Sequence, residues 1–217
     1  MTPLLLDGKV AAAALLDFLK PLVETLDPKL VVIQVGDDPA SSSYIKQKVK
    51  SCEKVSMRSE HIHIPSDTTI ETLMQKIDEL NNDEDVTGFF VQLPLPGQLS
   101  GHEPEIIKAI SPMKDVDGFG AYNLGKMFLS KEFEHLPPAT PSGIIRLLEH
   151  FDIEIEGKHA VVVGRSNTVG KPVAVMLLNR NATVTICHSR TKNLSEITKQ
   201  ADILIAAVGK PKMITAD

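Results

Sequence analysis

One stretch of the sequence, from His159 to Pro172, constrains the fold more than any other. It opens with His-Ala-Val-Val-Val, which is typical of a strand buried on both faces, as in a parallel sheet. Gly164 ends the predicted strand, and Pro172 suits the first position of a helix because its φ is fixed and it has no N–H. The loop between them would direct backbone N–H groups and a helix dipole at a ligand, and phosphate is the natural choice.

The loop departs from the G-x-G-x-x-G pattern of dinucleotide sites. Gly164 and Gly170 are six residues apart, and Ser166 stands where the second glycine would be. Strand–glycine–helix units also occur in sheets that bind nothing at this turn. The loop alone therefore leaves both interpretations open.

The next predicted strand, over residues 181–187, favours a nucleotide with an additional phosphate. NAD sites usually place Asp or Glu at the end of this strand, where it would repel a 2′-phosphate. Here the strand is followed by His188, Ser189, Arg190 and Thr191, and Arg165 is available from the first loop. Because guanidinium groups form bidentate bonds to phosphate, the sequence predicts NADP as the cofactor.

Composition excludes several classes of protein. The 217 residues suit one large domain or two small ones, and the net charge of −5 disfavours a nucleic-acid partner. No apolar run approaches the roughly 20 residues of a membrane span, and the N-terminus lacks the basic region of a signal peptide. Cys52 and Cys187 are expected to be free, buried thiols, which indicates a cytoplasmic protein.

Strand and helix patterns alternate along the whole chain, which predicts an α/β fold with parallel sheets. Strands are expected over residues 30–35, 61–64, 86–92, 159–163, 181–187 and 202–208. Helices are expected over 9–20, where Pro21 ends or kinks the helix, and over 44–55, 70–80, 103–110, about 142–151 and 194–200. Residues 40–43 would cap the second helix, and Thr140 or Ser142 the fifth. Residues 125–136 read as a hairpin-like connection, and 137–141 as the link between two domains.

Ligands of parallel sheets lie beyond the carboxyl ends of the strands. Three segments collect there in the first half of the chain: residues 36–43, Gln92 with the prolines after it, and residues 114–118. Tyr44 and Lys48 are expected to stack together on one helix face. His61 and His63 share one strand face, but no third ligand stands near them in the sequence, so no metal site is predicted.

Several motifs, in this order, resemble the bifunctional methylenetetrahydrofolate dehydrogenase/cyclohydrolase family of one-carbon metabolism. They are Tyr44-x-x-x-Lys48, Val91-Gln-Leu-Pro-Leu-Pro96, Lys114-Asp-Val-Asp-Gly118, Thr140-Pro-x-Gly143, and Gly164-Arg-Ser with Val169-Gly-Lys-Pro172. The resemblance covers essentially the whole chain, and the cytosolic bacterial form is the most similar.

The resemblance implies an enzyme with two domains and a cleft between them. Residues 1–138 would form a folate-binding catalytic domain, and residues 139–217 a Rossmann-like NADP-binding domain that is incomplete at its C-terminus. Such an enzyme oxidises 5,10-methylenetetrahydrofolate with NADP and hydrolyses the methenyl product to 10-formyltetrahydrofolate. Members of the family form homodimers through the cofactor domain. Their chains continue past the position of residue 217, so this sequence is either a fragment or a truncated protein.

The resemblance also assigns roles to individual residues. Lys48 would carry protons in the hydrolysis, Gln92 would position Lys48, Tyr44 would stack on the folate, and Asp117 would bind the pterin. Further substrate contacts are expected at Ser41, Leu93 and Pro94. The cofactor residues implied are Gly164, Arg165, Ser166, Val169, Gly170, Pro172, His188, Ser189, Arg190, Thr191, Ala207 and Gly209.

Two other functions stay open from the sequence. One is a different two-domain NADP oxidoreductase, of the shikimate dehydrogenase type, although the Tyr44, Lys48, Gln92 and Asp117 set would then lack a shared purpose. The other is a non-catalytic protein that binds NADP or a partner subunit through the unpaired edge of a half-built sheet.

Overall fold

The structure, a computed structural model, describes residues 4–215 and divides into two compact units. The first domain is Gly8–Ala121, and the second comprises residues 122–215 together with residues 4–7. The boundary lies at the first residue of α5 (Ala121–Leu129), because Leu124 and Met127 of that helix pack into the core of the second domain. The functional division expected between residues 138 and 139 stays a prediction.

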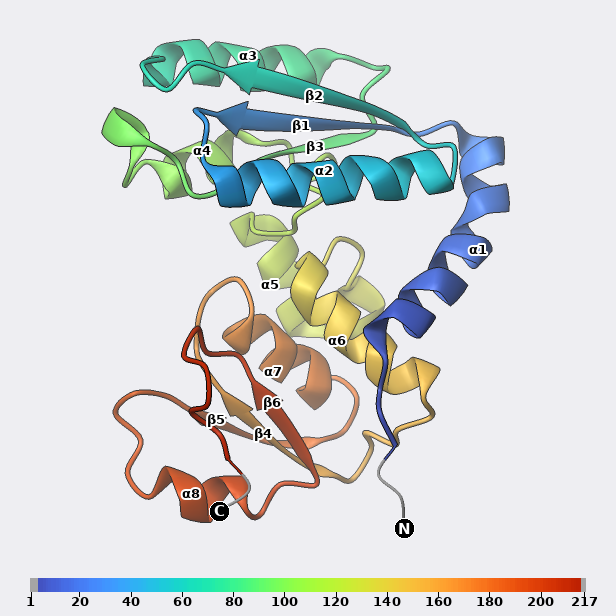
Figure 1. Ribbon diagram of the computed structural model, residues 1–217, viewed down its shortest axis with the longest axis vertical. Helices are drawn as coiled ribbons and strands as arrows, with labels where there is room; N and C mark the ends of the chain where they lie inside the picture. Colours follow the sequence, from blue (N-terminus) through green and yellow to red (C-terminus); the bar gives the residue numbers. More distant parts are fainter. Residues whose placement is uncertain (1–3, 216–217) are drawn as a thin grey trace. The chain divides into compact units, whose positions relative to one another are not determined.

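The first domain is built on a three-stranded parallel sheet (Figure 1). Its strands are β1 (Lys29–Val35), β2 (Arg58–Ile64) and β3 (Gly88–Val91), in the order β2-β1-β3. Ile33 of β1 is paired with Ile62 of β2 and Val91 of β3. The predicted parallel α/β fold is therefore confirmed, and all three strands end at one edge of the sheet.

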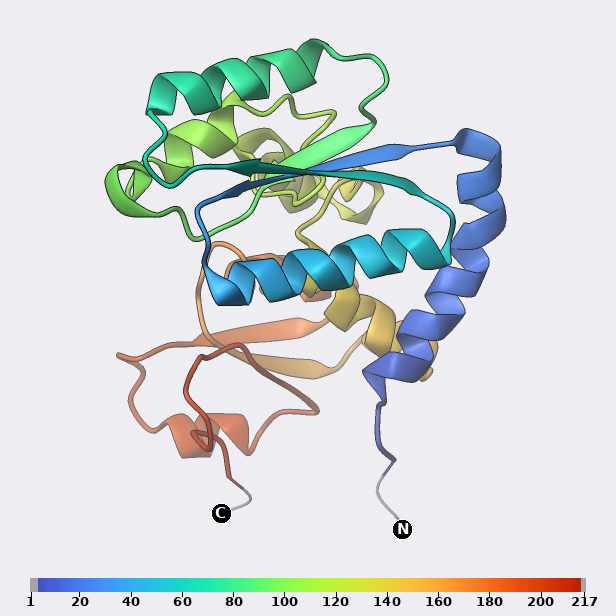
Figure 2. The same cartoon turned by 45° about the horizontal axis from the view of Figure 1, so that its top comes forward.

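Helices cover both faces of this sheet, as Figures 1 and 2 show. The α3 helix (Ile70–Asn82) packs on the face that carries Val31 and Ile33, while α2 (Pro39–Lys54) packs through Ile45 on the face of Val32. Val31, Val32 and Ile33 are all 0% exposed, which explains the continuous apolar run of β1. The α4 helix (Glu103–Ala109) adds Ile106 to the α3 side.

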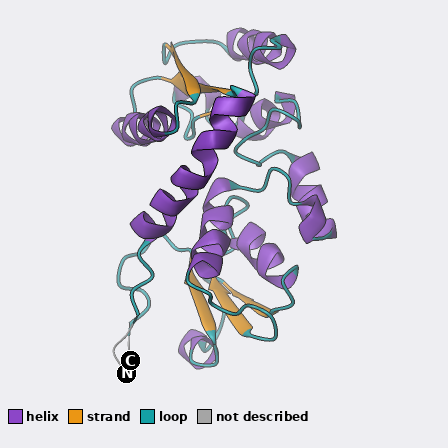
Figure 3. Ribbon diagram, turned by 90° about the vertical axis from the view of Figure 1, so that its right-hand side faces the viewer, coloured by secondary structure: helices purple, strands orange, loops and turns teal. Residues whose placement is uncertain are grey.

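The second domain repeats this plan with three parallel strands in the order β5-β4-β6, seen in orange in Figure 3. They are β4 (His159–Val163), β5 (Thr183–Cys187) and β6 (Ile203–Ala206). The α6 (Ala139–His150) and α7 (Gly170–Leu178) helices pack against one face, and α8 (Leu194–Thr198) packs against the other. The predicted strand over residues 159–163 is confirmed with the same bounds.

Three helices differ from the predictions for identifiable reasons. The α1 helix (Gly8–Leu26) continues past Pro21, which lies inside it. The α2 helix begins at Pro39, because Asp38 caps it with a side-chain bond to the Ser41 N–H, so residues 40–43 are helical and the predicted start at Tyr44 is wrong. The α6 helix begins at Ala139 without a side-chain cap, so neither Thr140 nor Ser142 is the N-cap.

The hairpin-like connection predicted over residues 125–136 is also wrong. The segment contains the end of α5 and a short 3-10 helix, Lys131–Phe133. Another 3-10 helix spans Gly97–Leu99 in the first domain. Among the described residues, no helix has the length and apolar character needed to cross a membrane.

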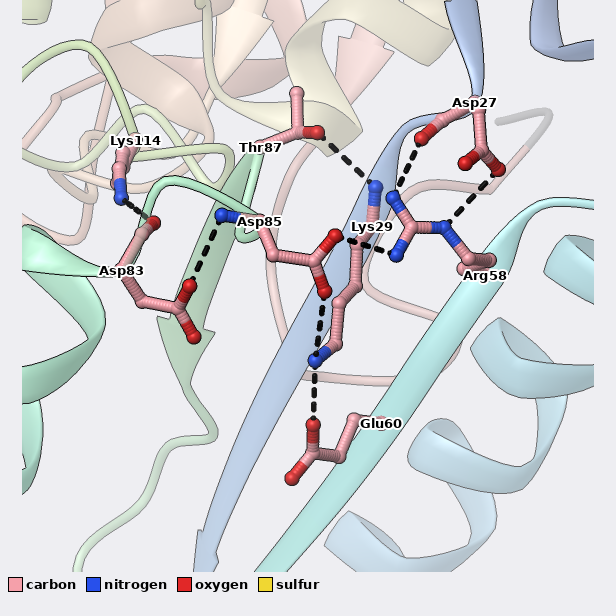
Figure 4. A network of polar contacts seen from close by, with 8 residues as sticks. All are labelled: Asp27, Lys29, Arg58, Glu60, Asp83, Asp85, Thr87 and Lys114. Carbon is pink, nitrogen blue, oxygen red and sulfur yellow. Dashed lines mark hydrogen bonds and ion pairs between the residues drawn. The ribbon is translucent and has the colours of Figure 1, made fainter.

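An ion-pair network joins the amino ends of the first domain's strands (Figure 4). Lys29 Nζ lies 2.9 Å from a carboxylate oxygen of Glu60 and 3.4 Å from one of Asp85. Arg58 reaches Asp85 at 2.6 Å and Asp27 at 3.0 Å, and its hydrogen bond lowers the pKa of Asp85. These ion pairs connect the strands at the edge of the sheet opposite their carboxyl ends.

Removal of the largest fully buried side chain tests the core of the first domain. Phe89 of β3 is 0% exposed, and we expect Phe89→Ala to lower the free energy of unfolding by about 3–5 kcal/mol. Met113 is 76% exposed, so Met113→Ala should change the free energy of unfolding by less than about 0.5 kcal/mol. Urea unfolding measures both; equal losses would contradict the assigned packing of Phe89.

Candidate active site

The α2 helix carries three of the predicted substrate residues, Ser41, Tyr44 and Lys48. Its start is fixed because Asp38 Oδ2 accepts the Ser41 N–H at 2.7 Å, and this bond lowers the pKa of Asp38. Pro39 follows in the first helical position, where a missing N–H costs nothing. Tyr44 and Lys48 are four residues apart and so lie on one side of the helix. Tyr44 itself is 62% exposed.

Lys48 lies between a carboxylate and an aromatic ring. Its Nζ is 3.5 Å from Asp117 Oδ1 and 3.5 Å from the centroid of the Phe90 ring. The aromatic partner of Lys48 is therefore Phe90, whereas the sequence predicted Tyr44. Burial raises the pKa of the Asp117 carboxyl, and the charge of Lys48 opposes that shift.

Gln92 directly follows β3 and so lies at the edge of the sheet where the strands of the first domain end. Its backbone N–H donates to Ile33 O at 2.8 Å, and its side-chain Nε2 donates to Leu93 O at 2.8 Å. The side-chain amide of Gln92 is thus bonded to Leu93, whereas the expected partner was Lys48. The Leu93–Pro94 peptide bond is cis.

Two buried polar atoms at this edge have no hydrogen-bond partner among the described residues. They are Gln92 Oε1 and Ser41 Oγ, and Ser41 is 4% exposed. An unsatisfied buried acceptor or hydroxyl is costly, typically about 1–3 kcal/mol, so such atoms are usually satisfied by a bound molecule or ordered water. A polar ligand with donors would suit them.

The roles of three residues at this edge were not predicted from the sequence. Asp38 caps α2, Phe90 packs under the Lys48 ammonium, and Asp115 is a buried carboxylate two residues before Asp117. The Asp-Pro pair at residues 38 and 39 was a readable cap signal. Nothing in the sequence distinguishes the orientation of Asp115 from that of Asp117.

In the second domain, the predicted loop after β4 is held very close to its neighbours. A Cβ on Gly164, whose φ is +133°, would lie 2.3 Å from Ala207 O, and one on Gly170 would lie 2.3 Å from Gly164 O. The chain can therefore pass from β4 into α7 along this path only with glycine at both positions. The helix begins at Gly170, which places Pro172 in its first turn.

Several of the loop's backbone N–H groups are already bonded within the loop. Ser166 Oγ accepts those of Val169 at 3.0 Å and Gly170 at 3.2 Å, and Ser166 O accepts that of Lys171 at 3.0 Å. The sequence predicted free N–H groups here, but Ser166 acts as an intramolecular acceptor for them. Ser166 shapes the loop by these bonds.

Two exposed guanidinium groups stand at the carboxyl ends of neighbouring strands. Arg165 follows β4 and Arg190 follows β5, and within residues 4–215 neither guanidinium has a hydrogen-bond or ion-pair partner. The turn of Arg190 is held by Thr191, whose hydroxyl accepts the His188 N–H at 2.8 Å, and Ser189 is exposed between them. Two free cations beside a hydroxyl fit the 2′-phosphate of NADP.

The remaining predicted cofactor residues follow β6. Ala207 donates its N–H to Val163 O at 2.8 Å, and Gly209 lies exposed two residues later. All three strands of the second domain therefore deliver predicted cofactor residues to one edge. The first domain does the same with its predicted substrate residues.

Comparisons with known proteins identify both domains. The chain matches the family model "Tetrahydrofolate dehydrogenase/cyclohydrolase, catalytic domain" over residues 6–117 and the corresponding NAD(P)-binding domain over residues 138–217. It is 51% identical over 221 residues to the bifunctional protein FolD of Halalkalibacterium halodurans, covering 100% of this chain and 78% of that protein. Among the curated relatives, the share of the relative that is covered ranges from 65% to 78%.

The chain is also similar to solved structures of dehydrogenase/cyclohydrolases. The bifunctional FolD dehydrogenase/cyclohydrolase of Campylobacter jejuni is 43% identical, with a TM-score of 0.89 over 95% of this chain and 74% of that one. A FolD of Trypanosoma brucei, complexed with NADP cofactor and an inhibitor, is 31% identical, with a TM-score of 0.90 over 97% of this chain and 74% of that one.

The close approach at Gly164 can be tested by adding one methyl group. We expect Gly164→Ala to lower the free energy of unfolding by roughly 1–3 kcal/mol or more, because the chain must leave its φ and separate from Ala207. Gly143 lies in α6 with nothing within 4 Å of its Cβ position, so Gly143→Ala should instead add about 0.5–1 kcal/mol. Urea unfolding of both variants decides; a neutral Gly164→Ala would contradict the packing described.

Proposed function

The chain belongs to the tetrahydrofolate dehydrogenase/cyclohydrolase family, and we propose that it oxidises 5,10-methylenetetrahydrofolate with NADP and hydrolyses the methenyl product to 10-formyltetrahydrofolate. The observation that carries the proposal is the group of side chains around Lys48. Lys48 contacts a largely buried carboxylate, that of Asp117, at the carboxyl edge of the domain that matches the catalytic model, and the unsatisfied amide oxygen of Gln92 belongs to the same edge.

The oxidation requires positioning more than proton transfer. Loss of hydride from the methylene carbon leaves a cation that the two neighbouring folate nitrogens share, so no protein base is required. NADP, when bound, accepts the hydride. The residues proposed to hold the folate are Tyr44, which offers an exposed ring, and Asp117, whose carboxylate suits the pterin amino and ring N–H groups.

The hydrolysis does require proton movement. Water attacks the methenyl carbon, loses a proton, and the ring then opens as one nitrogen gains a proton. We assign this relay to Lys48, because an amine beside the substrate can accept and return a proton. Gln92, with Ser41, Leu93 and Pro94, supplies the surrounding contacts, and its unsatisfied Oε1 can accept a hydrogen bond from the ligand or from the Lys48 amine.

In the cofactor site, Arg165 and Arg190, with Ser189, would bind the 2′-phosphate. The closely packed backbone at Gly164 and Gly170 would contact the remainder of the nucleotide. The other residues proposed for the site are Ser166, Val169, Pro172, His188, Thr191, Ala207 and Gly209. The fit rests on the two unpaired guanidiniums, since an NAD site would place an acidic residue there.

We further propose that the protein works in the cytoplasm as a homodimer. These two points rest on family membership. A shikimate dehydrogenase-type enzyme or a non-catalytic binding protein is not favoured, because both domains match one family of folate enzymes.

The role of Lys48 is tested by Lys48→Met, which keeps the side chain's length but removes the amine. We expect cyclohydrolase turnover to fall by at least about 100-fold, the usual contribution of a proton carrier, while folate and NADP still bind. Lys50→Met, on the exposed side of the same helix, is the matched control and should turn over normally. Unchanged hydrolysis of the methenyl substrate by Lys48→Met would remove the assignment.

The role of Arg165 is tested by cofactor choice. We expect Arg165→Ala to weaken NADP by roughly 10- to 100-fold, the value of a charge-assisted hydrogen bond, and to leave NAD binding almost unchanged. Arg146→Ala, an exposed arginine of α6, should change neither. Titration of both cofactors measures the difference, and equal losses for NADP and NAD would show that Arg165 does not recognise the 2′-phosphate.

A further inference from the structure

The loop that presents Asp117 is fixed to the sheet at its beginning. Phe89 of β3 donates its N–H to Lys114 O at 2.9 Å, and Lys114 Nζ donates to Leu80 O at 2.8 Å. Lys114 Nζ also donates to Asp83 O at 2.6 Å, the contact drawn in Figure 4. Asp115 then pairs with Phe89 as an isolated parallel bridge. The segment before Asp117 therefore behaves as a short extension of the sheet beside β3.

Val116 locks the same segment by packing. Its Cγ1 would lie 2.2 Å from a Cβ on Gly88, so the side chain occupies space that only a glycine leaves open. Val116 packs with Val32, Ile45 and Phe90, the cluster between α2 and the sheet. This contact ties the loop to the helix that carries Lys48.

The carboxylate of Asp115 holds the other side of the loop. Asp115 is 2% exposed; its Oδ1 accepts the Gly118 N–H at 3.0 Å, and its Oδ2 accepts the Gly120 N–H at 2.8 Å. Gly118 has a φ of +68°, and a Cβ on Gly120 would lie 2.8 Å from Asp115 Oδ2. The chain thus curls around this carboxylate, and Asp117 stands at the outside of the curl.

We propose that Asp115 is a positioning residue: its buried carboxylate fixes the curl of residues 115–120 and so holds Asp117 against Lys48 for the folate substrate. The inference deepens the function proposed above and rests on it for the identity of the substrate. The geometric part does not depend on it. A carboxylate that accepts two backbone N–H groups, one on each oxygen, is a specific device, because an amide has only one accepting oxygen.

The arrangement also places two carboxylates near each other with one ammonium. The carboxylate of Asp117 faces two charged groups: the ammonium of Lys48, which belongs to α2, and the carboxylate of Asp115, which belongs to the same loop as Asp117. Burial raises the pKa of Asp117 most, Lys48 lowers it, and Asp115 raises it further. Asp115→Asn removes the anion that raises the Asp117 pKa, so that pKa should fall in this variant. In Gly120→Ala the Asp115 anion remains, so a shift of the Asp117 pKa in that variant reports a changed position rather than a lost charge.

The experiment compares Asp115→Asn with Asp83→Asn. Asp83 is the matched control, because its Oδ1 also accepts a backbone N–H, that of Asp85 at 2.9 Å, but at the amino edge of the sheet. We expect Asp115→Asn to lower the Asp117 pKa, followed by carbon NMR of labelled aspartates and assigned with Asp117→Asn. We also expect kcat/KM for the methenyl substrate to fall roughly 10- to 100-fold, the effect of a misplaced contact, with NADP affinity unchanged. Asp83→Asn should leave the Asp117 titration and kcat/KM as in the parent protein.

Gly120→Ala tests the position with the charge retained and serves if Asp115→Asn does not fold. Its methyl group displaces Asp115 Oδ2, so kcat/KM should again fall about 10-fold or more. Variants that fold with an unchanged Asp117 titration and unchanged kcat/KM, even with a lower melting temperature, would overturn the proposal. If the parent protein turns over no folate, the proposed function fails, and the Asp117 titration in Gly120→Ala, where both carboxylates remain, still decides the positioning role.

Discussion

Parallel strand pairing is the constraint on which both domains depend. Because every strand of a parallel sheet runs in one direction, the loops after the strands meet at one edge and the loops before them at the other. In the first domain, the amino edge is filled by the network of Lys29, Arg58 and Asp85 (Figure 4), in which each cation contacts a carboxylate. The carboxyl edge is left with Lys48 and Asp117 in looser contact. The sheet's direction thus separates groups that stabilise the fold from groups that can bind a ligand.

Glycine turns that constraint into specific geometry. At the end of β4, Gly164 and Gly170 let strand, loop and helix approach to distances at which no side chain fits, and the loop cannot open without breaking β4 from Ala207. At β3, Gly88 admits Val116 in the same way. In each domain a missing Cβ therefore brings a functional loop onto the sheet, so that the rigid strands position the side chains that follow.

The sequence predicted regular elements well where apolar periodicity is strong. The strand at residues 159–163 was found with its bounds, because three consecutive valines between polar ends have no competing interpretation. The start of α2 was missed because a serine run resembles a cap, whereas Asp38 and Pro39 supply the actual one. The α5 helix was missed because its second half was assigned to a hairpin-like connection that begins at Gly125, whereas Met127 packs into the core of the second domain. The motif Asp115-Val-Asp117 shows the limit most clearly: two identical residues, two positions apart, differ in burial and partners only through tertiary contacts.

The contact between Lys48 and Asp117 is consistent with a site that exchanges its internal partners for a ligand. At 3.5 Å it is longer than the roughly 2.7–2.9 Å of a strong charge-assisted hydrogen bond. The side chains remain 36% and 19% exposed, so neither is committed as a buried structural pair, whose separation would be costly. By contrast, Arg180 and Glu134 of the second domain meet at 3.0 Å with exposures of 13% and 5%, as expected for a pair that supports the fold. A carboxylate that is firmly placed by its backbone but loosely paired by its side chain can bind a substrate without first breaking the structure that holds it.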